Sequence, residues 1–105
     1  MNHPLEDLTL KLRDFAAERH WEPFHSPKNL AAALSVEAAE LLEHFQWLTE
    51  EESRQLPADK QDAVALEAAD VLLYLLQLTD KLGIDLVAAA ERKLELNRQK
   101  YPVEQ

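Results

Sequence analysis

The sequence predicts an all-α fold, a four-helix bundle in a single domain over residues 1–105. The chain has one Gly among its 105 residues, whereas a strand protein of this size needs Gly at its tight turns and bulges. Apolar residues recur at three- and four-residue steps over long stretches, which is the helical period. The joints between these stretches are short, so we expect consecutive helices to pack as antiparallel hairpins.

The first expected helix runs from Pro4 to about Arg19. Its apolar residues follow the helical spacing: Leu5, Leu8, Leu12 and Phe15. The segment that follows, residues 20–27, contains two Pro residues and is expected to be a loop.

The second expected helix runs from about Lys28 to Leu48. Ser26 is placed to cap it, and Pro27 suits its first turn. Its apolar side is formed by Leu30, Leu34, Ala38, Leu41, Leu42, Phe45 and Leu48. The acidic and polar segment 49–57 is expected to be a connector.

The third expected helix begins with Asp59 as its cap and runs to about Lys81. Gly83, the single Gly, stands where the residue after a helix C-terminus belongs. Between Val64 and Leu78 this helix is apolar around most of its circumference, which is typical of a helix buried on all sides. A single four-helix bundle of this size buries little apolar surface, so we expect part of this helix to pack against a second subunit.

The fourth expected helix follows Asp85 as N-cap, runs from Leu86 to about Lys100, and is stopped by Pro102. A polar face recurs along it at i, i+4, i+7 and i+8, formed by Lys93, Asn97, Lys100 and Tyr101. Two interpretations are open for its cations. They either contact phosphate groups or offset the dipole at the helix C-terminus.

Composition narrows the class of protein. Twenty acidic against eleven basic residues give a formal charge of -9, which argues against a nucleic-acid polymer or a membrane surface as partner. The absence of Cys excludes disulfides, thiolate zinc sites and cysteine nucleophiles. No signal peptide is evident in the first residues and no apolar run is long enough to span a bilayer. We therefore expect a soluble cytoplasmic protein.

Four acids lie on the wrong side of their helices. At about 100° per residue, Glu37 falls within about 40° of the apolar stripe of the second helix, and Glu40 flanks that stripe. On the third helix Glu67 shares a face with apolar residues, and Asp70 lies one turn further along. Each pair therefore points two carboxylates into the predicted bundle.

Carboxylates gathered without cations must neutralise, pair or bind a metal. All-oxygen ligands favour a hard cation, Mg²⁺ or Mn²⁺. Two alternatives remain open: the acids lie on a solvated face, or they pair with Lys and Arg of the last helix. A di-iron site is disfavoured, because it needs a Glu-x-x-His spacing and no His follows Glu37 or Glu67 at that step.

These residues resemble the MazG-like nucleotide pyrophosphohydrolases, and the wider pattern is similar to their dCTP pyrophosphatase branch. The resemblance lies first in the paired motifs Glu37-Ala-Ala-Glu40 and Glu67-Ala-Ala-Asp70. Further similar stretches are Phe15-Ala-Ala-Glu18-Arg19 leading to Trp21, Phe24-His25 with Pro27 and Asn29, Phe45-Gln46-Trp47, Asp70-Val71-Leu72-x-Tyr74, and Lys93-x-x-x-Asn97-Arg98-x-x-Tyr101-Pro102.

The resemblance implies an all-α fold that assembles as a homodimer or homotetramer. It implies Mg²⁺-dependent hydrolysis of a nucleoside triphosphate to the monophosphate and pyrophosphate, as in nucleotide-pool sanitising. The implied metal ligands are Glu37, Glu40, Glu67 and Asp70. The implied substrate contacts are Trp21 and Trp47 around the base, Tyr74 near the sugar or phosphates, and Lys93, Asn97 and Tyr101 at the phosphate side.

Glu40 is our candidate for the general base that activates water, because it flanks the apolar stripe. A competing hypothesis is a non-catalytic helical dimerisation module whose acidic core is stabilised by a cation. Related pyrophosphohydrolases that act on phosphoribosyl-ATP or dUTP would differ only in the pocket.

Overall fold

The computed structural model describes residues 3–104, and all regular structure in that range is helical, which confirms the all-α class. The elements in chain order are α1 (Pro4–Glu18), the short 3-10 helix η1 (Glu22–Phe24), α2 (Pro27–Glu43), α3 (Glu50–Arg54), α4 (Ala58–Lys81) and α5 (Leu86–Lys100). Five α-helices are present where four were expected. Within residues 3–104, no helix is both long and apolar enough to cross a membrane.

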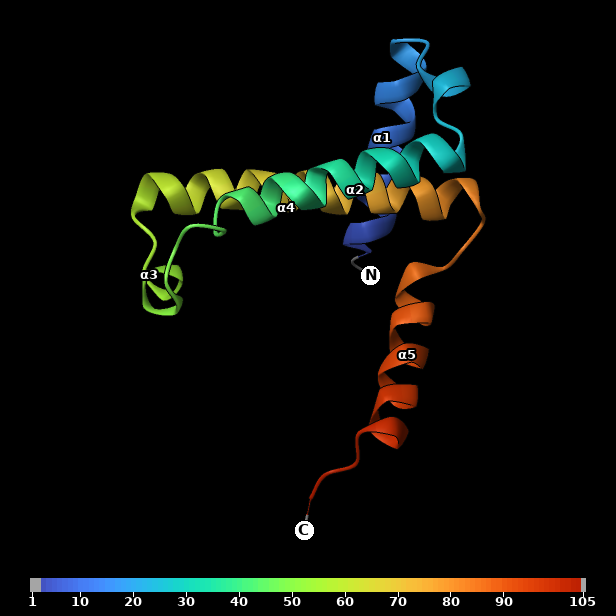
Figure 1. Cartoon of the computed structure of the whole chain (residues 1–105). Coiled ribbons are helices and arrows are strands. Elements are labelled where there is room, and N and C mark those ends of the chain that lie inside the picture. The colour runs from blue at the N-terminus through green and yellow to red at the C-terminus, as the bar shows by residue number, and fades with distance from the viewer. Residues whose placement is uncertain (1–2, 105) are drawn as a thin grey trace.

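The centre of the molecule is an antiparallel pair formed by α2 and α4, and α1 crosses α4 (Figure 1). Buried apolar side chains are few in the described range: Ala16 of α1, Leu30 of α2 and Leu76 of α4, of which Leu30 is fully buried. Each of the three packed helices thus contributes one. Many other apolar residues stay partly exposed, so the core of one chain is small.

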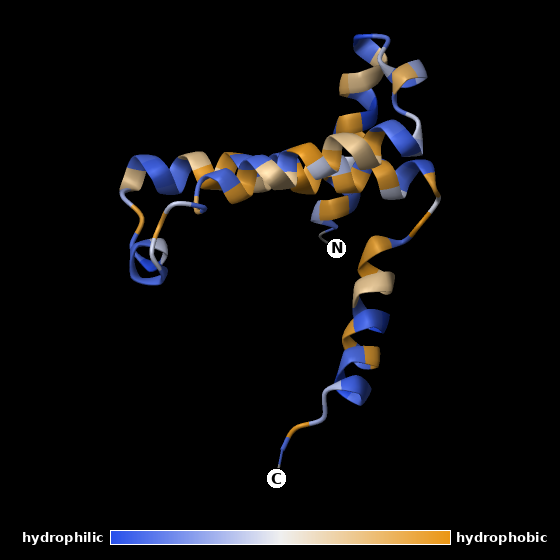
Figure 2. Ribbon diagram, viewed as in Figure 1, coloured by the Kyte–Doolittle hydropathy of each residue, from blue (hydrophilic) through white to orange (hydrophobic). Residues whose placement is uncertain are grey.

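The predicted antiparallel hairpin of the last two helices is wrong within one chain. Helix α5 leaves the end of α4 and runs away from the α2–α4 pair (Figure 1), and within residues 3–104 only its first turns lie near α1 and α4. Gly83, at a φ of +66°, closes α4 in the left-handed conformation that Gly adopts at low cost. Charged and apolar residues alternate along the free α5 (Figure 2), and Leu94 is 58% exposed.

Helix α2 ends at Glu43 instead of Leu48, and the expected connector contains helix α3. Helix α3 begins with a capping box. Glu52 N–H donates to Thr49 Oγ1 at 3.1 Å, and Thr49 N–H donates to Glu52 Oε1 at 2.9 Å. The acidic run after Thr49 therefore forms the first turn of α3, where the helix dipole favours negative charge.

Two predicted N-caps are confirmed and one is wrong. Ser26 Oγ accepts from Asn29 N–H at 3.1 Å, and Asp85 Oδ1 accepts from Ala88 N–H at 3.0 Å. For α4 the N-cap residue is Pro57, and Asp59 lies inside the first turn. A carboxylate there is still favoured by the helix dipole, although it does not cap the helix.

The loop after α1 turns sharply and brings Trp21 back onto that helix. His20 adopts a positive φ of +57°, and Trp21 N–H donates to the Ala16 carbonyl at 3.0 Å. As a result the Trp21 and Phe15 rings meet edge to face with centroids 5.6 Å apart. Asn29 Nδ2 then holds the loop by donating to the Phe24 carbonyl at 2.9 Å.

An ion pair between Arg13 and Asp80 joins α1 to α4, and Arg13 Nε donates to Asp80 Oδ2 at 2.9 Å. This hydrogen bond is the main cause that lowers the pKa of Asp80; burial opposes the shift, and the charges of Arg13 and Lys81 add to it. A lowered carboxyl pKa stabilises the fold above the unfolded value near pH 4, and the contribution is lost as pH falls through the folded value.

We therefore expect Asp80→Asn to lower the thermal midpoint by roughly 2–5 °C at pH 7, since the pair is partly exposed. The gap between variant and wild type should close progressively below pH 4. Thermal unfolding followed by circular dichroism from pH 7 to pH 3 measures this. Asp62→Asn on the same helix is the control. A gap that is constant with pH would contradict the role of the ion pair.

Candidate functional site

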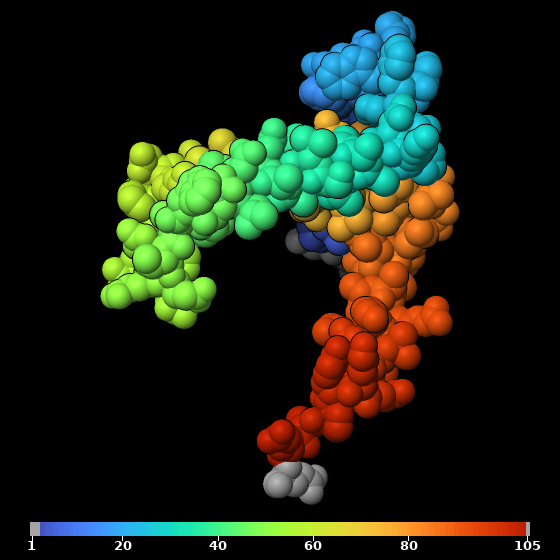
Figure 3. Space-filling model, viewed as in Figure 1, coloured from blue at the N-terminus to red at the C-terminus, as the bar shows by residue number. Residues whose placement is uncertain are grey.

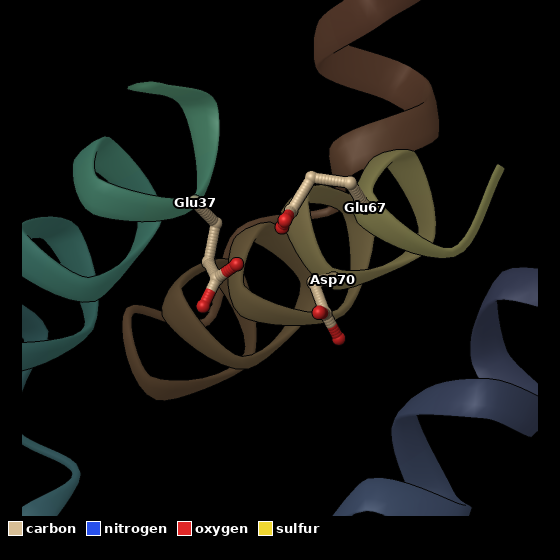
Figure 4. Close-up of side chains that lie close together, drawn as sticks. All are labelled: Glu37, Glu67 and Asp70. Atoms are coloured by element: carbon tan, nitrogen blue, oxygen red, sulfur yellow. The ribbon is translucent and has the colours of Figure 1, made fainter. Parts of the chain in front are cut away.

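Three carboxylates from two helices converge between α2 and α4: Glu37 of α2 with Glu67 and Asp70 of α4 (Figure 4). One oxygen from each lies within 4.8 Å of the others. The i, i+3 spacing places Glu67 and Asp70 on one face of α4, and antiparallel α2 brings Glu37 to the same place. Two elements distant in sequence therefore build one acidic cluster.

Two oxygens of this acidic cluster are buried and have no hydrogen-bond donor among the described residues: Glu37 Oε2 and Glu67 Oε2. A buried carboxylate oxygen in that position must protonate or bind a cation. The donor set is all oxygen, which suits Mg²⁺ or Mn²⁺ rather than a softer metal. The residues present therefore fit the hard cation that the sequence implied.

Crowding of the acids changes their proton affinity. The Glu67 carboxyl, close enough to share a proton with Glu37, is the main cause that raises the pKa of Glu37. The Glu40 carboxyl opposes this shift, and lost hydration and the charges of Glu67 and Asp70 add to it. Glu37 raises the pKa of Glu40, first through the proximity of its carboxyl and then through its charge. Glu37 and Glu40 therefore resist ionising, and a cation beside them would favour their charged forms.

Glu40, the proposed general base, lies beside the acidic cluster and outside its closest group. It belongs to the same turn of α2 as Glu37 and interacts with the Glu37 carboxyl, but the three oxygens within 4.8 Å of one another come from the other acids. It is also exposed, whereas Glu37 and Glu67 are half-buried. This separates one solvent-accessible carboxyl from the inner cluster.

A cleft of about 390 Å³ opens between α1, the loop after it and α4, and it reaches the acidic cluster at Asp70. Phe15, Trp21 and Tyr74 line it with aromatic rings, and the His25 ring lies 6.2 Å from that of Trp21. Aromatic walls beside carboxylates suit a ligand with a flat ring at one end and charge at the other. We refer to this space as the aromatic cleft.

The other residues predicted to contact the substrate do not lie at the aromatic cleft within a single chain. Trp47 lies in the turn after α2, is 86% exposed, and is not part of the aromatic cleft. Lys93 and Asn97 lie on α5, and Tyr101 directly follows it. Helix α5 runs away from the α2–α4 pair (Figure 1), and none of these three residues lines the aromatic cleft.

Several residues of the aromatic cleft were missed by sequence reasoning: Lys11, Phe15, His25 and Gln77. A signal for Lys11 was available, since it flanks the apolar stripe of α1 as Glu40 flanks that of α2. His25 and Gln77 had no such signal. Their place depends on how the loop after α1 folds back and on where α1 crosses α4.

We expect Mg²⁺ to raise the thermal midpoint of the protein, because a cation relieves repulsion in the acidic cluster. At a concentration ten to a hundred times the dissociation constant, the shift should be roughly 5–10 °C. Glu37→Gln should lose most of this shift, and Glu43→Gln, on the exposed side of α2, should keep it. Differential scanning fluorimetry with MgCl₂ against NaCl of equal ionic strength measures it. An equal shift in both variants would place the cation elsewhere.

The MazG-like family model matches residues 32–105, a range that contains both acidic pairs. The chain belongs to the MazG-like family. Members of this family usually depend on a metal ion, in agreement with the donor set of the acidic cluster. The family match also covers α5, most of which runs free of the other described helices.

Named relatives extend the comparison. The chain is 44% identical to dCTP pyrophosphatase 1 of Mus musculus over 101 residues, or 94% of this chain, and 43% identical to that of Homo sapiens over 100 residues, or 93%. It spans 59% of the length of each of these two relatives. A crystal structure of a pyrophosphatase from Archaeoglobus fulgidus superposes with a TM-score of 0.91 at 43% identity, over 98% of this chain and 96% of that chain.

Proposed function

We propose that this MazG-like chain hydrolyses a nucleoside triphosphate, of the dCTP type, to the monophosphate and pyrophosphate. The observation that supports this best is the continuity of two features at Asp70, which belongs to the acidic cluster and also lines the aromatic cleft. The names of the relatives, dCTP pyrophosphatase 1 and a pyrophosphatase, point to the same reaction.

In this proposal the nucleobase enters the aromatic cleft against Trp21 and Tyr74, and the phosphates extend toward Asp70. Net charge of -9 repels a triphosphate at long range, so binding requires a local change of sign at the acidic cluster. Glu37, Glu67 and Asp70 would hold Mg²⁺, and Glu40 lies beside them. When bound, the cation supplies charge stabilisation at the reacting phosphorus.

Glu40 is the residue we assign to proton acceptance from water. It is exposed to solvent, and the raised pKa of its carboxyl makes it a stronger base than an isolated Glu. In this proposal Glu37, Glu67 and Asp70 bind the cation, so their carboxylates are less available to accept a proton from water. Glu40→Gln should therefore reduce turnover while leaving the Mg²⁺-dependent thermal shift largely in place.

We also propose that the chain works as a homo-oligomer. It exposes 8499 Å², against about 6,000 Å² for a compact monomer of its mass. Its radius of gyration is 16.9 Å, against about 13 Å for a compact domain of this length. An excess of about 2,500 Å² per chain falls in the range that obligate oligomers bury. The surface is hollowed between α3 and α5 (Figure 3), which leaves room for another chain.

Helix α5 is the element that an oligomer would cover first, because among residues 3–104 only its first turns lie near other helices. Val87 and Leu94 on α5 are about half exposed. If α5 packs on a neighbouring copy, Lys93 and Asn97 come to serve a site they cannot reach in their own chain. This would supply the phosphate contacts that the acidic cluster lacks.

The reaction is tested by measuring pyrophosphate and orthophosphate release from a panel of ribo- and deoxynucleoside triphosphates with Mg²⁺. We expect pyrophosphate with the matching monophosphate, and the fastest turnover on a cytosine deoxynucleotide. The related substrates dUTP and phosphoribosyl-ATP belong in the same panel. Release of orthophosphate alone, or equal turnover by wild type and by Asp70→Asn, would refute the proposal.

The second candidate is a non-catalytic dimerisation module with a cation-stabilised acidic core, which the large exposed apolar surface favours. It predicts that Mg²⁺ raises the thermal midpoint and that no nucleotide adds a further shift. The enzyme predicts an additional shift with a non-hydrolysable triphosphate. Thermal unfolding with Mg²⁺, with and without that analogue, separates the two.

A further inference from the structure

Lys11 is an exposed, charged residue at the edge of the apolar face of α1. On a helical wheel it lies within about 60° of Leu8 and Phe15, and all three side chains line the aromatic cleft. A lysine in such a position packs its aliphatic stem on the apolar face and holds its ammonium group at the rim. Here that rim is the edge of the aromatic cleft, where a ligand can meet the ammonium group.

Lys11 is also the single cation of that cleft: within the described part of the chain, no other Lys and no Arg lines it. Over residues 3–104 the ion pairs within 4.0 Å involve four other cations, namely Arg13, Arg19, Arg54 and Arg98. The ammonium group of Lys11 is thus available to a ligand at the edge of the aromatic cleft.

Asp70 lines the same cleft from α4, and its side chain points to the side of the acidic cluster on which α1 lies (Figure 4). A nucleotide whose base occupies the aromatic cleft must pass its first phosphate between α1 and Asp70 to reach the cluster. We propose that Lys11 contacts the α-phosphate of the bound nucleotide, an inference that builds on the proposed function. The β- and γ-phosphates lie further from the nucleoside, on the side of the acidic cluster, so we expect Lys11 to make no contact with them.

A contact between Lys11 and the α-phosphate should affect the affinities of different ligands differently. In a pyrophosphohydrolase the bond between the α- and β-phosphates is cleaved, so the α-phosphate stays with the monophosphate and the other two leave as pyrophosphate. A Lys11 ammonium that donates to an α-phosphate oxygen therefore binds triphosphate and monophosphate alike. It adds nothing to the binding of a nucleoside without phosphate or of free pyrophosphate.

The test is isothermal titration of Lys11→Met with three probes in the presence of Mg²⁺: deoxycytidine monophosphate, deoxycytidine and inorganic pyrophosphate. We expect monophosphate affinity to fall about tenfold, which corresponds to one charge-assisted hydrogen bond. The affinities of deoxycytidine and pyrophosphate should stay unchanged. Lys11→Gln should behave like Lys11→Met, Lys11→Arg should retain affinity, and Lys60→Met at the far end of α4 should match wild type.

Equal weakening of deoxycytidine and its monophosphate would overturn the proposal, because the lysine stem would then act by packing in the cleft. Loss of pyrophosphate affinity with intact monophosphate affinity would overturn it too, because Lys11 would then serve the leaving group. Failure of the proposed reaction is a separate result, in which wild type binds monophosphate and releases no pyrophosphate.

Discussion

Glu37→Gln is expected to reduce pyrophosphate release from dCTP by about a thousandfold, since it removes one charge from the acidic cluster that would hold the cation. Glu37 contributes one of the three oxygens that lie within 4.8 Å of one another, and a second Glu37 oxygen is buried without a donor. An amide of nearly the same size keeps the packing of α2 on α4. Steady-state turnover at saturating Mg²⁺ and nucleotide measures the loss.

The fold of Glu37→Gln should survive and should even gain stability in the absence of Mg²⁺. The raised pKa of Glu37 means that ionised Glu37 opposes folding above its unfolded pKa, and the amide removes that penalty. Glu43→Gln, the same substitution one turn beyond Glu40, should retain wild-type activity. Similar activity loss in both variants would show that net charge, and not the acidic cluster, governs the reaction.

Activity is expected to return when two inactive variants are combined in one oligomer. Lys93→Ala removes the proposed phosphate contact of α5, and Glu37→Gln disables the acidic cluster. If α5 serves a neighbouring copy, a mixed dimer contains one site with both intact residues and should show about half of wild-type activity. Co-expression with two different tags, followed by tandem purification, isolates the mixed species for assay.

Homo-oligomers of each variant, purified in the same way, provide the baseline for this complementation. Size-exclusion chromatography with light scattering should first show that wild type and both variants assemble equally. Mixed dimers as inactive as the parents would mean that α5 folds back onto its own chain in solution. A monomeric wild type would contradict the assembly itself.

The acidic cluster was largely predictable because a helix fixes the direction of every side chain along it. Once α2 and α4 were recognised by their apolar spacing, the places of Glu37, Glu67 and Asp70 followed from 100° per residue. Glu40 was predicted as a fourth ligand, and its role there stays a prediction, since it lies beside the three-oxygen group.

The aromatic cleft and the course of α5 were harder to predict, for physical reasons. Trp21 reaches the cleft because His20 adopts a left-handed conformation after α1. The spacing of apolar residues along a helix does not predict this conformation. The direction of α5 depends on the turn at Gly83 and on surfaces outside the single chain. A short joint favours an antiparallel neighbour, but it does not determine which copy supplies that neighbour.

The central claim is that the bond between the α- and β-phosphates is broken in a nucleotide held between the aromatic cleft and the acidic cluster. Hydrolysis of dCTP in ¹⁸O-enriched water, with mass spectrometry of the products, tests this directly. The account predicts a single ¹⁸O atom shared between monophosphate and pyrophosphate, with no labelled orthophosphate. Release of labelled orthophosphate together with the nucleoside diphosphate would contradict it.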